Sequence, residues 1–127
     1  MNFIQAVTSV FKNSFNFKDR AMRSEYWYFM LFSMGAGFVA GLFDAASFPE
    51  MLAEYGTGPV GIIEGLALLV PSISVTIRRL HDVNKSGWWQ LIALTIIGII
   101  PLFYWMIKKG DAGENRFGED PMSFTQV

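Results

Sequence analysis

Three long apolar segments dominate the pattern of hydrophobic and polar positions along this chain. They run from Tyr26 to Phe43, from Val60 to Ile77 and from Trp88 to Ile107, and the first and third contain no charged residue. A helix that crosses the hydrocarbon core of a bilayer needs about 20 predominantly apolar residues, within a range of roughly 17 to 25. The pattern therefore predicts an all-α membrane protein with three transmembrane helices, over residues 26–43, 60–77 and 88–107.

The composition favours a membrane protein over a soluble one. Apolar residues make up 52% of the 127 residues and charged residues only 17%, below the share of about 25% that is usual in soluble domains. A soluble all-α protein could bury one such segment, but three of them leave too little polar surface to cover the core. The length predicts one domain, residues 1–127. The absence of cysteine excludes disulfides, thiolate nucleophiles and cysteine-based metal sites.

Residues 1–24 precede the first apolar segment and contain an amphipathic pattern. Apolar residues recur there at Phe3, Ile4, Val7, Val10, Phe11 and Phe15. This spacing predicts a helix with one apolar face. One interpretation is an interfacial amphipathic helix, with that face in the headgroup region of a membrane. The other is a helix packed beneath the transmembrane bundle.

Basic residues are segregated along the chain and predict its orientation. Lys and Arg occur before the first apolar segment and between the second and the third, and none lies between Ser24 and Ile77. Because short loops rich in Lys and Arg stay in the cytosol, both basic segments are predicted to be cytosolic. The N-terminus is then cytosolic, and residues 44–59 lie on the opposite side.

The polar tail, residues 108–127, fits this rule less well. Three plain transmembrane helices would leave the lysines and the arginine of the tail on the side opposite the other basic residues. A re-entrant third segment, bent near Gly98 and Pro101, would return the tail to the cytosol. Such backbone is tolerated only where it is buried in protein or lines a water-filled cavity. Three plain helices are therefore the favoured interpretation.

Glu64 is the one charged residue inside the second predicted transmembrane helix. At 1.5 Å per residue it lies about 21 Å from Arg78, and therefore within a hydrocarbon core about 30 Å thick. An intramembrane acid is a candidate for handling protons or cations, and Pro71 predicts a kink in the same helix. The alternative is a carboxyl group that reaches surface water or is protonated.

Glycines recur at a spacing of four in the first two predicted transmembrane helices, as Gly37 and Gly41 and as Gly61 and Gly65. Small residues at this spacing let helix backbones approach closely. The pattern predicts close packing of these two helices, either within one chain or between copies in a homo-oligomer.

The segment from Arg78 to Trp89 is charge-dense and separates two apolar runs. Arg78 and Asp82 have the i, i+4 spacing of a helical ion pair. Arg79 is then available for Glu25 or for a lipid phosphate, since anionic headgroups attract such cations with about 1 kcal/mol each. A solvated loop that only fixes the topology is the alternative.

His81 is the only histidine in the chain. With no cysteine, and with Asp82 as the nearest carboxylate, it predicts no metal site. A triad of Ser86, His81 and Asp82 also fails, because adjacent side chains on a helix diverge by about 100°. The sequence therefore predicts no catalytic residue and no cofactor, and His81 is interpreted as part of a polar cluster at the cytosolic interface.

Three ordered motifs resemble those of the DUF805 family. Phe17–Trp27 is similar to its opening pattern F-x-G-R-x-x-R-x-E-Y/F-W, Arg78–Asp82 followed by Ser86–Trp89 to its central signature, and Asn115–Pro121 to its closing one. The family comprises small bacterial inner-membrane proteins of unknown function. The resemblance thus implies a multi-pass protein of the bacterial inner membrane and assigns no catalytic residue. Asp19 departs from the pattern, which usually has glycine there.

The leading hypothesis is a non-enzymatic inner-membrane protein that interacts with membrane lipids, anionic phospholipids among them, or with a protein partner. A net charge of −1 argues against nucleic acid. The candidate residues are Arg20, Arg23, Glu25, Arg78, Arg79, His81 and Asp82, with Asn115 and Arg116 if the tail folds back. The alternative is a small oligomeric transporter or channel subunit that uses Glu64. A lipid-modifying enzyme near His81 would lack a nucleophile or metal set.

Overall fold

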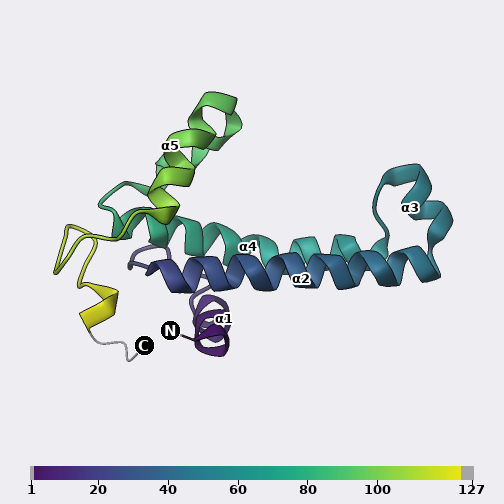
Figure 1. The fold of residues 1–127 in the computed structure, drawn as a ribbon, viewed down its shortest axis with the longest axis horizontal. Helices are drawn as coiled ribbons and strands as arrows, with labels where there is room; N and C mark the ends of the chain where they lie inside the picture. The colour runs from purple at the N-terminus through teal and green to yellow at the C-terminus, as the bar shows by residue number, and fades with distance from the viewer. Residues whose placement is uncertain (1, 124–127) are drawn as a thin grey trace.

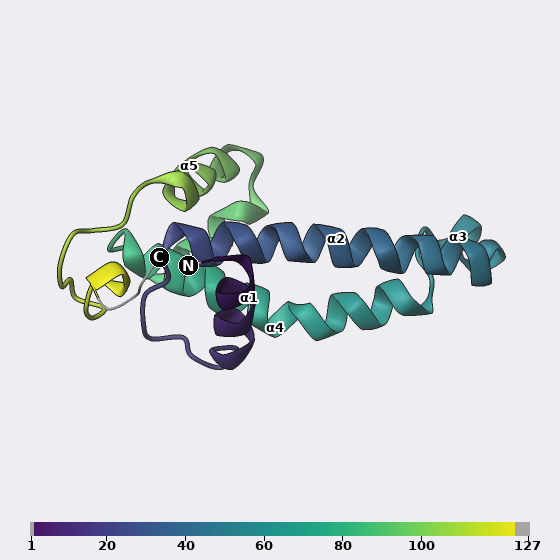
Figure 2. The same cartoon turned by 60° about the horizontal axis from the view of Figure 1, so that its bottom comes forward.

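Two long antiparallel helices, α2 (Arg23–Ser47) and α4 (Pro59–Asp82), lie side by side along the length of the molecule (Figures 1 and 2). The computed structural model describes residues 2–123. At 1.5 Å per residue each helix is about 36 Å long, enough to cross a hydrocarbon core about 30 Å thick. Both are also apolar enough to cross a membrane. The prediction of an all-helical chain is confirmed for the described residues, with two helices of membrane-spanning length.

The two helices are joined at one end of the molecule by a short helix, α3 (Pro49–Tyr55). Asp44, near the end of α2, is 1% exposed and caps the start of α4. Its Oδ1 accepts from the backbone N–H of Val60 (3.1 Å), and its Oδ2 accepts from that of Gly61 (2.8 Å). The first N–H groups of a helix have no partner within the helix, so a carboxylate there satisfies them and interacts favourably with the helix dipole. The sequence predicted no such cap.

Replacing Asp44 by Ala should therefore destabilise the pairing of α2 and α4. We expect the free energy of unfolding in detergent micelles to fall by about 1–2 kcal/mol, the usual cost of losing a helix cap. The control is Glu54→Ala in α3, which removes an exposed carboxylate at the same end of the molecule. Equal stability of the two variants would contradict the capping role.

The predicted N-terminal helix is present as α1 (Phe3–Lys12), which crosses α2 and packs against it (Figure 2). Ala6 and Val10 are fully buried in this contact. Phe3 packs edge-on against Tyr28 of α2, at 6.0 Å between ring centroids. The apolar face is thus used at least in part against the helix pair, and a position in the membrane interface stays a prediction.

The prediction of one continuous helix over residues 88–107 is wrong. The segment forms a 3-10 helix, η1 (Gly87–Leu94), followed by a separate α-helix, α5 (Ile96–Ile107). Thr95 between them is extended, and its hydroxyl accepts from the backbone N–H of Gly98 (3.0 Å). A threonine hydroxyl that caps a helix favours a new start over continuation. The 12 residues of α5 span about 18 Å, too little for a core of about 30 Å.

The predicted glycine contact between the first two helices is absent for three of the four glycines. Among the described residues, a Cβ atom added to Gly37, Gly41 or Gly65 would meet nothing within 4 Å outside its own helix. Gly61 does lie against Asp44, the capping residue. Within the chain, α2 and α4 therefore do not pack through the predicted glycine pairs, and a role of these pairs between copies stays a prediction.

Candidate functional site

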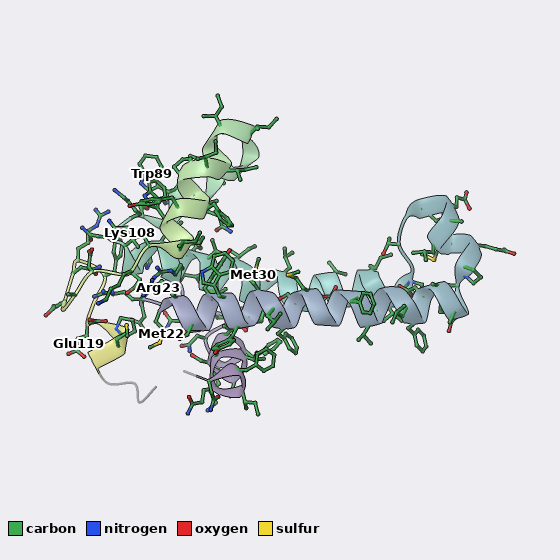
Figure 3. All side chains as sticks on the ribbon, viewed as in Figure 1. Met22, Arg23, Met30, Trp89, Lys108 and Glu119 are labelled. Carbon is green, nitrogen blue, oxygen red and sulfur yellow. The ribbon has the colours of Figure 1, made fainter. Side chains whose placement is uncertain are left out.

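Three segments that are distant in the sequence converge at the end of the molecule where α2 begins and α4 ends, which we call the basic end. They are the segment before α2, the last turn of α4, and the tail after α5. Figure 3 shows Arg23, Lys108 and Glu119 together at this end. Backbone hydrogen bonds fix the arrangement: Ala21 N–H donates to Arg78 O (2.9 Å), and Asp111 N–H donates to Asp82 O (2.7 Å).

Asp82 is the centre of a buried ion-pair network at the basic end. Its Oδ1 accepts from Arg20 Nε (3.0 Å), and its Oδ2 accepts from Arg79 Nη1 (2.5 Å). The exposed fractions of Arg20, Arg79 and Asp82 are 6%, 0% and 4%. Charges at this depth are tolerated only when they are paired and hydrogen-bonded, and both carboxylate oxygens are occupied.

The remaining guanidinium nitrogens of Arg20 are bonded to the tail. They donate to the backbone carbonyls of Asp111 (2.5 Å), Gly113 (2.6 Å) and Gly118 (3.1 Å). Gly110 lies so close to the Asp82 carboxylate that an added Cβ would clash with it. The tail therefore folds back onto the basic end. This is the outcome expected for a bent third segment, but the chain breaks at Thr95 and not near Gly98 and Pro101.

Arg79 connects the ion-pair network to the segment before α2 and to the end of α5. It donates through Nε to Met106 O (3.2 Å) and through Nη1 to Ala21 O (3.3 Å), and its Nη2 donates to Lys108 O. One fully buried side chain thus holds the segment before α2, the end of α5 and the beginning of the tail. It is not available to the lipid phosphate that the sequence suggested.

Arg78 faces a different partner from the predicted one. Its Nη1 donates to Glu25 Oε2 (2.5 Å), and both side chains are buried. The predicted pair of Arg78 and Asp82 is wrong, because Asp82 is held by Arg79 and Arg20. The broader hypothesis, that the first two helices bring Glu25 to the arginine pair, agrees with the geometry.

His81 is held in one orientation by its neighbours. Its Nδ1 lies 3.1 Å from Lys18 O and 3.0 Å from Asp19 O, and because both partners are acceptors this nitrogen must carry the proton. The ring stacks on Phe117, with centroids 3.9 Å apart. Asn115 Nδ2 donates to His81 O (2.9 Å), so the predicted contribution of Asn115 depends on the folded-back tail.

Two of the predicted site residues remain at the surface. Arg23 is exposed and donates through Nη1 to Ile107 O (3.4 Å). Arg116 is also exposed, lies over the ring of Phe117 at 4.7 Å, and donates to Asn84 O (3.3 Å). These two, unlike the buried arginines, could meet a headgroup without rearrangement.

Sequence reasoning missed several residues that build this site. Ser74 donates through its hydroxyl to Asn13 O (2.7 Å), which ties α4 to the turn after α1. Trp27 Nε1 donates to Met106 O (3.0 Å), which holds the end of α5. Phe117 stacks on His81. Of these, Trp27 and Phe117 carried a signal, as members of the opening and closing motifs, and Ser74 carried none.

Two of the hollows at the basic end adjoin the ion-pair network. The first, which we call the polar cavity, has a volume of about 340 Å³ and lies between α1, the segment before α2 and the tail. The second, the apolar groove, measures about 700 Å³ and runs along α4 beside η1. The groove is lined by apolar side chains, among them Phe17, Ile73 and Trp88, with His81, Ser86 and Gln90 as its polar groups.

The chemistry that these groups could perform is limited. Within residues 2–123 no three His, Asp or Glu side chains gather as metal ligands. Glu64 is partly buried and makes no hydrogen bond or ion pair in the described part of the chain. The interactions at this site hold segments of the chain together.

Comparison with known proteins gives a family and relatives named as inner membrane proteins. A family model described as "Protein of unknown function (DUF805)" matches residues 14–119. The chain is 40% identical over 121 residues to the inner membrane protein YhaH of Escherichia coli (strain K12), covering 88% of this chain and 92% of that one. It is 32% identical over 119 residues to the inner membrane protein YhaI of the same strain, covering 93% and 96%. No solved structure matches significantly.

The helix pair, its exposed apolar faces and the relatives define a class: this is a small helical membrane protein. Large side chains such as Met34 (71% exposed), Phe38 (69%) and Ile63 (67%) cover the outer faces of α2 and α4, where a water-soluble protein would avoid so large an apolar patch. The chain belongs to the DUF805 family.

Proposed function

We propose that this protein is a non-enzymatic, multi-pass protein of the inner membrane that holds a phospholipid at its basic end. The apolar groove along α4 is the observation that carries the proposal. Its volume of about 700 Å³ lies within the range of roughly 300–1,000 Å³ of ligand sites, and it combines apolar walls with a few polar groups, as such sites do. With the exposed outer faces of α2 and α4 in the bilayer, acyl chains could enter the groove.

The proposal includes an orientation in which the basic end faces the cytosol. Seven of the ten Lys and Arg residues lie before α2 or after α4. The other three, Arg23, Arg78 and Arg79, lie at the start of α2 and the end of α4, which are also at the basic end. Residues 44–59, at the opposite end, contain no Lys or Arg. The folded-back tail adds Lys108, Lys109 and Arg116 to this end, which removes the conflict with the positive-inside bias. Two membrane crossings, with the third apolar segment entering from the cytosolic side only, fit these charges better than three.

A phosphate could be held by the exposed cations beside the groove. Lys18 follows Phe17, which lines the groove, and Arg116 lies on the ring that stacks against His81. Exposed basic side chains at a membrane surface attract anionic lipid with about 1 kcal/mol each. The buried arginines serve instead to hold the segments that form the groove.

A groove-filling variant tests the proposal. Ile73→Trp places a larger side chain inside the groove, and we expect the purified protein to retain several-fold less phospholipid, as measured by lipid mass spectrometry. Ile63→Trp is the control, since it adds the same bulk on the same helix at an exposed position outside the groove. Equal lipid retention by the two variants would remove the basis for the proposal.

The alternative hypothesis, an oligomeric transporter or channel subunit using Glu64, has less support. Glu64 lacks a polar partner within the described residues, and an ion pathway needs more than one such group. The unoccupied faces at Gly37 and Gly41 leave room for a second copy, so a homo-oligomer is compatible with lipid binding as well.

A further inference from the structure

The polar cavity is a second hollow at the basic end, separate from the apolar groove. Its walls come from α1 and the turn that follows, which contribute Ser9, Asn13 and Asn16, and from the segment before α2 and the tail. It shares none of its lining residues with the groove. The ion-pair network and the proposed lipid groove assign no role to the polar cavity.

One wall of the polar cavity contains a buried cation with an unused donor. Arg78 is 2% exposed, and its Nη1 is paired with Glu25, but its Nη2 is buried and has no hydrogen-bond partner among residues 2–123. Buried guanidinium nitrogens are almost always satisfied, and an orphan donor calls for an acceptor that occupies the site. A phosphate oxygen is a suitable acceptor, because hydrogen bonds between two charged groups are the strongest in proteins.

The rim of the polar cavity has the opposite charge. Asp19 and Glu119 line it and are exposed, whereas Arg78 and Glu25 are buried. With Arg20 included, the charged side chains of the lining are two arginines and three carboxylates. A purely anionic ligand would meet this carboxylate excess and be repelled, so charge complementarity requires a ligand that carries a cation as well as an anion.

We propose that the polar cavity binds a phosphoethanolamine group, with its phosphate toward Arg78 Nη2 and its primary ammonium toward Asp19 and Glu119. Asn16 Nδ2 donates to Asp19 Oδ2 (2.8 Å) and so holds this carboxylate at the rim. The group can arrive as the headgroup of phosphatidylethanolamine or as free O-phosphoethanolamine. This site differs from the groove in both place and charge preference, so it does not rest on the proposed function.

Calorimetric titration of the full-length protein in an uncharged detergent tests the chemistry. We expect O-phosphoethanolamine to bind at one site per chain, and phosphocholine and inorganic phosphate to bind at least tenfold more weakly. Phosphocholine has no N–H to donate to the rim, and inorganic phosphate has no cation. Equal binding of phosphocholine and O-phosphoethanolamine would overturn the proposal.

Three conservative variants test the residues. Asp19→Asn and Glu119→Gln remove rim charge at exposed positions, and Arg78→Lys keeps a cation for Glu25 but removes Nη2. Each should weaken O-phosphoethanolamine binding about tenfold, the value expected for one charge-assisted hydrogen bond. Glu114→Gln is the matched control, an exposed tail carboxylate outside the cavity. Unchanged affinity in both rim variants would count decisively against the assignment.

Nanodiscs distinguish the two sources of the group. If the lipid headgroup is the ligand, discs containing phosphatidylethanolamine should block the soluble compound, and phosphatidylcholine discs should not. Binding that is equal in both kinds of disc assigns the free compound, and no binding in micelles or discs refutes the site. Ile73→Trp should leave this affinity unchanged, so failure here is distinguishable from failure of the lipid groove.

Discussion

Replacing Asp82 by Asn should destabilise the protein more than any other single change of one acid to its amide. The variant leaves two buried guanidinium groups, those of Arg20 and Arg79, without their counter-ion. Removing one partner from a buried ion pair usually costs about 3–5 kcal/mol, because an uncompensated charge remains. We expect a loss of that size in the free energy of unfolding, measured in mixed micelles.

The same variant should also release the tail. Arg20 and Asp82 together hold residues 111–118, so trypsin should cleave after Lys108 and Lys109 in Asp82→Asn much faster than in the parent protein. Glu114→Gln makes the same chemical change at an exposed position in the tail and should alter neither stability nor cleavage. A loss below about 1 kcal/mol in Asp82→Asn would contradict the role given to the network.

Substitution by lysine should have a much larger effect on stability at Arg79 than at the adjacent Arg78. The guanidinium group of Arg79 donates to four acceptors. In Arg79→Lys a single ammonium group takes its place, and it cannot match that geometry. We expect a loss of roughly 3 kcal/mol, about the value of one or two buried hydrogen bonds to a charged group. Hydrogen exchange should rise in the segment from Met106 to Asp111, which Arg79 holds.

Arg78→Lys is the matched control for this variant, because the change is the same one residue away. A lysine there can still pair with Glu25, the one charged partner of Arg78 in the part of the chain that the structure describes. We expect a loss of about 1 kcal/mol and no change in exchange near Met106. A loss from Arg78→Lys as large as that from Arg79→Lys would show that the two arginines do not have distinct structural roles.

The helix pair could be predicted from the sequence because uninterrupted apolar runs are a direct signature of membrane-spanning length. The meeting of Glu25 with the arginine pair was also predictable, since Glu25 lies at the start of α2 and the arginines lie at the end of the antiparallel α4. The choice of partner was not, because neighbouring side chains on a helix point about 100° apart. Arg78 therefore faces Glu25 while Arg79 faces Asp82 and the tail, a difference that depends on helix rotation.

The break at Thr95 could not be read from hydropathy. Residues 88–107 are apolar on both sides of it, and only the capping hydroxyl distinguishes the position. The indirect signal was electrostatic: three plain helices left Lys108, Lys109 and Arg116 on the wrong side. The folded-back tail resolves that conflict through long-range hydrogen bonds to Arg20, which no local pattern encodes.

We expect the segment before α2 and the tail, which are joined at one end of the two-helix hairpin, to lie on the same side of the membrane. The chain has no cysteine, so single cysteines can be labelled without background. Exposed positions are available in each region: Lys12 before α2, Glu54 at the opposite end, and Glu114 in the tail. A membrane-impermeant maleimide added to intact cells should label Glu54→Cys only, with Lys12→Cys and Glu114→Cys reacting after lysis. Labelling of Glu114→Cys in intact cells would contradict the account.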